Sequence, residues 1–219
     1  MTIYLGLGTN IGNKEENPML VEKSKRILDL AKDLETDIVT THIGKIPEDT
    51  TCVKYNTMFE ACKSIADYAA SIGATFAIET GPEMADVLCD FVNAAGDGVG
   101  VNLDPANFVM VTGQDPAEAV RLLGKKIVHT HLKDGKMLRK ADPLIIYNHF
   151  AEGGIEALNI ADFFIETPVG EGDVNWAEYI AALREIEYDG YLTIERETGD
   201  DPIADIKKAA DFVRENGYI

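Results

Sequence analysis

The chain has 219 residues, of which 46% are hydrophobic, and this is enough for one domain, residues 1–219, with a sizeable core. The 38 Asp and Glu residues outnumber the 20 Lys and Arg residues, and the resulting net charge of −18 repels a phosphate backbone, so we expect no nucleic-acid partner. No run approaches the roughly 18 to 20 apolar residues of a membrane span, and residues 1–4 lack the basic flank of a secretory signal, so we expect a cytoplasmic protein with no membrane partner.

Short β-branched runs alternate with longer segments of helical period, a pattern typical of βαβ units and a parallel sheet. Most of the runs are nearly continuously apolar, as strands buried on both faces are. The six expected strands are residues 2–7, 37–42, 74–79, 98–104, 126–131 and 190–195.

Three helices are expected to begin where a capping side chain precedes a proline. These starts are Asn17-Pro18, Asp115-Pro116 and Asp201-Pro202. A further helix is expected to begin near Asn175, and the connection that leads to it from His131 spans about forty residues, far more than the usual 2 to 6. We therefore predict a lid or a binding loop there, with no strand at 144–149, because that run is short and follows Pro143.

Five of the six expected strands end on a side chain that titrates or binds metal ions. These residues are His42, Glu79, Asp104, His131 and Glu195. In a parallel barrel all strands open at their carboxyl ends onto one mouth, where active sites lie, so we expect these side chains to converge. Three carboxylates and an imidazole suit one divalent ion, Mn²⁺, Mg²⁺, Co²⁺ or Zn²⁺.

Each of these residues also has a purely structural interpretation. Asp104 precedes Pro105 and could cap a turn, Glu79 and Glu195 could be solvated strand ends, and His42 or His131 could be a core histidine. The recurrence of such residues at strand ends favours the metal site.

Other polar and glycine residues carry weaker signals. His129 points to the same face as His131, so we expect it to support that residue or to lie in the core, and we expect His149 on the surface. The three cysteines form no C-x-x-C pair and are expected to be reduced core residues. Gly6-Leu7-Gly8 lacks the third glycine of a dinucleotide loop, since Ile11 stands in its place.

Several segments together resemble the xylose isomerase-like TIM barrels, a family that includes sugar phosphate isomerases, ketose 3-epimerases and, more distantly, endonuclease IV. The likeness runs from about residue 1 to 210, and the matching segments are Thr41-His42-Ile43-Gly44, Ala77-Ile78-Glu79-Thr80-Gly81-Pro82-Glu83, Val101-Asn102-Leu103-Asp104-Pro105-Ala106-Asn107, His129-Thr130-His131-Leu132-Lys133-Asp134-Gly135, Gly170-Glu171-Gly172 and Leu192-Thr193-Ile194-Glu195-Arg196-Glu197.

The resemblance implies a metal-dependent sugar or sugar-phosphate isomerase or epimerase that works through an enediolate. It implies that Glu79, Asp104, His131 and Glu195 bind one metal ion and that Glu79 and Glu195 also act as acid and base.

The substrate contacts depart from the family in one place. Asn107 stands where ketose 3-epimerases carry a histidine, and an amide can hydrogen-bond a hydroxyl without changing charge. We expect His42 and Asn107 to bind substrate, and we expect Lys133 and Arg196 to hold a phosphate or carboxylate unless they are solvated surface charges. The segment Gly170-Glu171-Gly172 is similar to part of a lid.

Other activities remain open on the same scaffold. A dehydratase or lyase would use the same metal and enolate, and a non-catalytic sugar-binding relative would keep the fold alone. An endonuclease IV-like repair enzyme fits poorly, because its three-zinc site needs more than the four histidines present.

The family's barrel has eight βα units, and the motif order makes residues 2–7 its third strand. We therefore predict a TIM-barrel type parallel (β/α) barrel that lacks its first two βα units. Its exposed edges are expected to make it a homo-oligomer.

Overall fold

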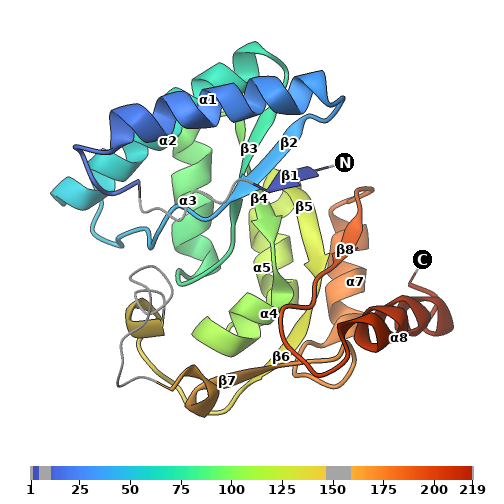
Figure 1. The fold of residues 1–219 in the computed structure, drawn as a ribbon. Coiled ribbons are helices and arrows are strands. Elements are labelled where there is room, and N and C mark those ends of the chain that lie inside the picture. The colour runs from blue at the N-terminus through green and yellow to red at the C-terminus, as the bar shows by residue number, and fades with distance from the viewer. Residues whose placement is uncertain (1, 5–10, 147–158, 219) are drawn as a thin grey trace.

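The computed structural model describes residues 2–4, 11–146 and 159–218, and it is built around one open parallel sheet (Figure 1). The sheet has six strands in the order β1-β2-β3-β4-β5-β8, and every neighbouring pair runs parallel. The strands are β1 (Thr2–Tyr4), β2 (Ile38–Thr41), β3 (Thr75–Glu79), β4 (Val99–Leu103), β5 (Ile127–Leu132) and β8 (Leu192–Ile194).

All six expected strands are present, and the sheet is open as predicted. Strands β1 and β8 form its two edges, and no pairing joins them within the described residues. The expectation of burial on both faces holds for β4, whose five residues are all buried, but it is wrong for β8, where Thr193 is exposed. An edge strand has a neighbour on one side only, so part of β8 stays in contact with solvent.

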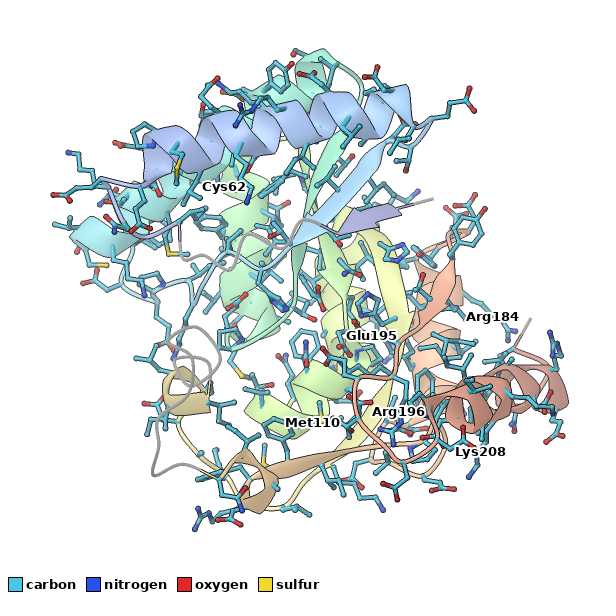
Figure 2. The ribbon with its side chains drawn as sticks, in the orientation of Figure 1. Cys62, Met110, Arg184, Glu195, Arg196 and Lys208 are labelled. Carbon is cyan, nitrogen blue, oxygen red and sulfur yellow. The ribbon has the colours of Figure 1, made fainter. Side chains whose placement is uncertain are left out.

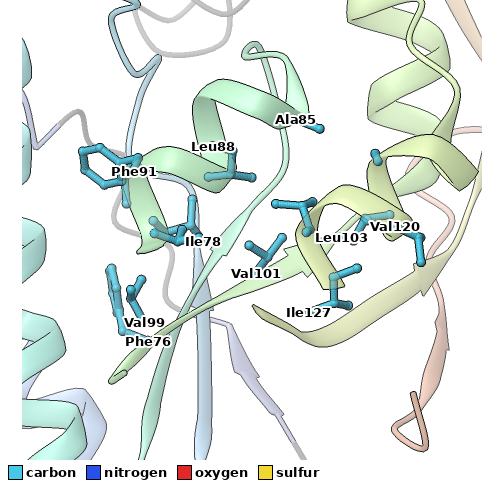
Figure 3. Close-up of a cluster of buried hydrophobic side chains, with 14 of the residues drawn as sticks. Phe76, Ile78, Ala85, Leu88, Phe91, Val99, Val101, Leu103, Val120 and Ile127 are labelled. Atoms are coloured by element: carbon cyan, nitrogen blue, oxygen red, sulfur yellow. The ribbon is translucent and has the colours of Figure 1, made fainter. Parts of the chain in front are cut away.

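Helices cover one face of the curved sheet (Figure 1). They are α1 (Asn17–Asp33), α2 (Val53–Ser71), α3 (Ala85–Ala95), α5 (Pro116–Leu123), α7 (Trp176–Glu185) and α8 (Pro202–Glu215). Short helical segments lie in two of the connections, α4 (Pro105–Asn107) and η1 (Phe108–Thr112) between β4 and α5, and η2 (Gly124–Lys126) between α5 and β5. Figure 3 shows the core between this face and the helices, where Ile78 and Val101 of the sheet lie near Leu88 and Phe91 of α3. Because side chains alternate along a strand, the opposite face of β3 carries Glu79.

One glycine sets how closely a helix approaches the sheet. A Cβ atom at Gly98, just before β4, would lie 1.9 Å from the Ala66 carbonyl oxygen of α2. Only glycine allows this approach, which keeps the start of β4 against the helix layer.

The capping signals at the helix starts are confirmed in two of three cases. Asp115 and Asp201 each accept a hydrogen bond from a backbone N–H in the first turn of their helix. Asn17 does not cap α1, because it lies inside the helix and its amide donates to the carbonyl oxygens of Ile11 and Thr57 instead. A cap was plausible from the Asn-Pro pair, but these tertiary contacts take the side chain.

The long connection before α7 contains structure that its sequence did not reveal. Strands β6 (Asp134–Met137) and β7 (Phe164–Thr167) pair antiparallel, and a short η3 helix (Ile160–Asp162) precedes β7. Residues 143–146 are helical, in keeping with the absence of a strand there, and 147–158, including the expected surface residue His149, lie outside the described residues. The sequence showed no clear unit in this connection, because two four-residue strands far apart in sequence give little periodic signal.

Candidate metal centre

Four of the predicted residues converge at the carboxyl ends of the strands. Glu79 ends β3, Asp104 follows β4, His131 lies near the end of β5, and Glu195 follows β8. One potential ligand atom from each of them lies within 4.8 Å of all the others. The first three side chains are buried, whereas the Glu195 side chain at the sheet edge is 32% exposed.

The imidazole of His131 lies at the middle of this cluster. Its Nδ1 atom is 2.9 Å from Glu195 Oε2, 3.7 Å from Asp104 Oδ2 and 3.8 Å from Glu79 Oε1. The cluster is thus built by three adjacent strands, β3, β4 and β5, together with the edge strand β8.

Asp104 divides its two oxygens between structure and the site. Its Oδ1 atom accepts hydrogen bonds from the backbone N–H groups of Ala106 and Asn107, and so caps α4. Its Oδ2 atom is buried without a hydrogen-bond partner and points toward His131. The capping interpretation and the ligand interpretation of Asp104 therefore apply to different oxygens of the same carboxylate.

Asn102 orients His131, and the sequence did not single it out. Its side-chain amide lies 3.2 Å from His131 Nε2, and Asn102 is fully buried. The amide nitrogen faces Nε2 in this structure, and turning the amide so that its oxygen accepts from Nε2–H would leave the Nδ1 lone pair facing the three carboxylates. The only available signal was its position two residues before Asp104, on the same face of β4.

The two glutamates of the cluster have opposite pKa shifts. Burial raises the pKa of Glu79 to about 8, although nearby His131 acts in the other direction. Burial also acts to raise the pKa of Glu195, but His131 and Lys133 outweigh it and hold that pKa below its ordinary value. Glu79 therefore keeps its proton to a higher pH than Glu195 does.

The donor set fits a divalent cation. Glu79 Oε2, Asp104 Oδ2 and His131 Nδ1 are buried atoms without a well-formed hydrogen bond, and such atoms are costly unless a ligand or ion satisfies them. Three carboxylates and one imidazole match the hard-to-borderline preference of Mg²⁺, Mn²⁺, Co²⁺ and Zn²⁺. Glu79, Asp104, His131 and Glu195 are thus the residues that could hold one ion.

Two expected substrate-binding residues lie beside the cluster. His42 follows β2, and its Nε2 atom is 3.7 Å from Glu79 Oε2. Burial lowers the His42 pKa, although Asp104 and Glu195 act to raise it. Asn107 donates from its amide to the Thr80 carbonyl oxygen at 2.8 Å, so this part of its side chain ties α4 to the end of β3.

The two expected anion-binding residues are already surrounded by acids. Lys133 Nζ lies 3.0 Å from Glu195 Oε2, inside the cluster. Arg196 turns away from the cluster toward α8, as Figure 2 shows for Glu195 and Arg196, and its guanidinium pairs with Glu166 and Asp205.

Two further predictions concern His129 and the cysteines. His129 Nε2 lies 3.0 Å from Thr193 Oγ1, and its ring meets the ring of His131 edge-on, which fits the expected supporting role. All three cysteines are free, as expected, but of these only Cys62 is fully buried.

The segment expected to form part of a lid is fastened to the body of the protein. The backbone N–H groups of Gly170 and Gly172 both donate to the buried Asp134 carboxylate. A Cβ atom at Gly170, where φ is +85°, would lie 2.6 Å from the Phe212 ring of α8.

A cavity of about 490 Å³ lies away from the carboxylate cluster. Its walls come from the outward side of β8 and from α7 and α8, and they include Leu192, Ile194 and Val213. It forms an apolar outer groove beside the edge of the sheet.

Among the described residues, none of the helices is long and apolar enough to cross a membrane.

Comparison with known families gives a match over almost the whole chain. The family model of the xylose isomerase-like TIM barrel matches residues 1–216. An uncharacterized protein of Bacillus subtilis strain 168, YfiH, is 30% identical over 111 residues, which cover 48% of this chain and 33% of that protein. An uncharacterized protein of Methanocaldococcus jannaschii, MJ1311, is 24% identical over 223 residues, covering 93% of this chain and 64% of that protein. The chain therefore spans less than two thirds of either relative.

Solved structures share the fold. A xylose isomerase domain protein from Planctomyces limnophilus superposes with a TM-score of 0.72 at 27% identity, over 95% of this chain and 67% of that one. An L-ribulose 3-epimerase gives a TM-score of 0.70 at 19% identity, over 98% and 73% of the two chains.

Proposed function

Because the chain belongs to the xylose isomerase-like TIM barrel family, we propose that it is a metal-dependent isomerase or epimerase acting on sugars. The observation that carries this proposal is the buried cluster of Glu79, Asp104, His131 and Glu195 at the carboxyl ends of the strands. In barrels of parallel strands this end is where catalysis occurs.

The relatives support the reaction class. Structural neighbours include an L-ribulose 3-epimerase and a D-psicose 3-epimerase, and a family protein from Mycobacterium smegmatis was solved in complex with magnesium. These likenesses lie at 18% to 19% identity, so the activity of this chain rests on its own residues.

The cluster offers the groups that enolisation requires. A bound divalent ion would supply the positive charge that acidifies a C–H beside a carbonyl. Glu79 and Glu195 reach the site from different strands, so one carboxylate would remove a proton and the other would return one to the opposite face, inverting the carbon. Transfer between neighbouring carbons by a single carboxylate would isomerise the sugar instead.

The test is exchange of solvent deuterium into a panel of pentuloses, hexuloses and their phosphates. We expect label at the abstracted carbon, loss of exchange with EDTA and recovery with Mn²⁺ or Co²⁺. A protein that binds no divalent ion after soaking would contradict the proposal.

A dehydratase would use the same cluster. One structural neighbour is the probable 3-DHS dehydratase AsbF from Bacillus anthracis, at 21% identity and a TM-score of 0.67. Product analysis by NMR separates the two reactions, because only a dehydratase releases water and forms an unsaturated product.

A further inference from the structure

Lys133, a basic side chain beside the proposed metal ligands, is fully paired with carboxylates and is not available to bind a substrate anion. The Lys133 ammonium lies 2.6 Å from Glu197 Oε2, 3.0 Å from Glu195 Oε2 and 3.5 Å from Asp104 Oδ2, and its side chain is only 5% exposed. An ammonium group has three N–H donors, and a fourth carboxylate, Glu166 Oε2, lies 4.0 Å from this one. Lys133 is therefore a fixed, neutralised cation.

The second basic side chain is equally engaged. Arg196 NH1 lies 2.7 Å from Glu166 Oε1, and Arg196 Nε lies 2.8 Å from Asp205 Oδ2. Glu166 Oε1 also accepts the backbone N–H of Glu197 at 3.0 Å, so the guanidinium and Glu166 together hold the segment after β8. The side chain of Arg196 is 8% exposed, and a ligand could reach it only by disrupting this contact set.

The network of ion pairs around the site has an excess of negative charge. Six carboxylates face two permanent cations, the acids being Glu79, Asp104, Glu166, Glu195, Glu197 and Asp205 and the cations Lys133 and Arg196. With a divalent ion bound and all six acids ionised, six negative charges would oppose four positive ones. A phosphate dianion would thus enter a site that already repels it.

The loop after β2 adds no uncompensated cation. Lys45 follows His42 and Gly44, and its Nζ atom lies 3.9 Å from Asp142 Oδ1. The Lys45 ammonium therefore also has a carboxylate partner.

We propose, on the premise of the sugar isomerase or epimerase function above, that the substrate is an uncharged polyhydroxy carbonyl compound and that its phosphate ester is rejected. To bind a phosphate, Lys133 or Arg196 would have to leave its partners, and buried carboxylates would lose their counter-ions. Hydroxyl groups meet no such obstacle, since each can donate a hydrogen bond to an exposed carboxylate such as Glu197. The expectation that Lys133 and Arg196 hold a phosphate is thereby replaced by discrimination against one.

The first test compares matched substrates. Solvent-deuterium exchange is measured for ketopentoses and ketohexoses and for the same sugars carrying a terminal phosphate. We expect kcat/KM for the unphosphorylated member of the preferred pair to be at least about 100-fold higher. A higher value for the phosphate ester would overturn the inference and leave the proposed enolising function intact. Failure of every pair to exchange would instead count against the proposed function.

A binding measurement decides the inference even without turnover. Xylitol and xylitol 5-phosphate cannot enolise, and their binding to the Mg²⁺-loaded protein is measured by titration calorimetry. We expect xylitol 5-phosphate to bind no more tightly than xylitol. Tighter binding of the phosphate by about tenfold or more would overturn the inference.

A variant tests whether the acids around Lys133 are the cause. Glu197→Gln removes the nearest partner of Lys133 at a side chain that is 65% exposed, so the fold should tolerate it. We expect binding of xylitol 5-phosphate relative to xylitol to improve by about tenfold. Glu22→Gln on α1 removes an equal charge from an exposed pair with Lys25 and should leave the ratio unchanged. Equal ratios in Glu197→Gln and the parent protein would contradict the explanation.

Discussion

Two of the four proposed ligand residues hold protons that a metal ion must displace. Burial acts to lower the pKa of His131, but the Asp104 and Glu195 carboxylates outweigh it and raise the pKa to about 10. Burial raises the pKa of Glu79 to about 8. Both groups are therefore protonated at pH 7 in the metal-free protein, and only their deprotonated forms bind metal.

Mg²⁺ affinity should consequently rise with pH between 6 and 9. Below both pKa values each displaced proton contributes up to about tenfold in affinity per pH unit. Calorimetry in two buffers of different ionisation enthalpy gives the number of protons released. Glu178→Gln, at an exposed acid of α7 paired with Arg121 and away from the cluster, is the control and should keep the same pH dependence. A flat affinity from pH 6 to 9 would show that these protons are not displaced.

Replacing Glu79 or Glu195 by the isosteric glutamine should abolish activity while the fold is retained. Glu79→Gln and Glu195→Gln remove a proton-transfer group and a metal ligand together, so deuterium exchange should fall by about 10³-fold or more. Glu178→Gln, an exposed acid of α7 paired with Arg121, provides the matched control. Circular dichroism and unfolding midpoints check that the fold survives, and a parent-like rate in either site variant would remove that residue from the mechanism.

At the scale of elements, the buried Asp134 carboxylate organises the turn that leads to α7. It accepts hydrogen bonds from the backbone N–H groups of Gly170, Gly172 and Val174 and from the Trp176 indole. A Cβ atom at Gly172 would lie 1.9 Å from the Asp134 carboxylate, so glycine is required for this close approach.

Asp134→Asn should therefore destabilise the protein by about 3 kcal/mol. The amide keeps one acceptor oxygen and turns an NH₂ group toward N–H donors that then lack a partner. Urea unfolding measures the loss. The exposed residue Asp33 at the end of α1 gives the control Asp33→Asn, for which a change within about 0.5 kcal/mol is expected. Equal midpoints for the two variants would mean that Asp134 does not fasten this turn.

How far the sequence predicts this molecule depends on the range of the interactions. The parallel strands can be predicted from the sequence because apolar runs such as Val99–Leu103 are long and are followed by polar residues. Glu79, Asp104, His131 and Glu195 could be grouped because the carboxyl ends of parallel strands share one edge of the sheet. The β6–β7 pairing, the contact of Asn102 with His131 and the ion pair of Arg196 with Glu166 join segments far apart in the chain, and no local sequence pattern predicts them.

At the scale of the whole molecule, the edge strand β8 is expected to recruit a second copy of the chain. Tyr191, next to β8, is 72% exposed, and the apolar outer groove lies beside it. An unpaired strand edge is a template for pairing, and the same edge on two copies can pair about a twofold axis.

Light scattering at about 0.15 M salt, where the net charge of −18 is screened, should show a dimer. Tyr191→Glu should shift the population toward monomer, whereas Val53→Glu, at a position on α2 that is even more exposed, should not. A strictly monomeric parent protein at high concentration would contradict the prediction.

The position of Glu195 has a consequence for local motion. Strand β8 is joined to the sheet through three residue pairs with β5, and the most exposed of the four proposed ligand residues, Glu195, directly follows it. Strands with few such links open more often than the centre of a sheet, and their amide hydrogens exchange sooner.

An ion held by Glu79, Asp104, His131 and Glu195 would tie this loose edge to three inner strands. Metal binding should therefore slow hydrogen exchange in 192–195 more than in 99–103, since a ligand stabilises the closed form by mass action. Hydrogen exchange is measured by mass spectrometry. If metal binding slows exchange equally in both segments, β8 stays paired with β5 even without the ion. The same four side chains that would bind the catalytic ion would then also decide how often the sheet frays.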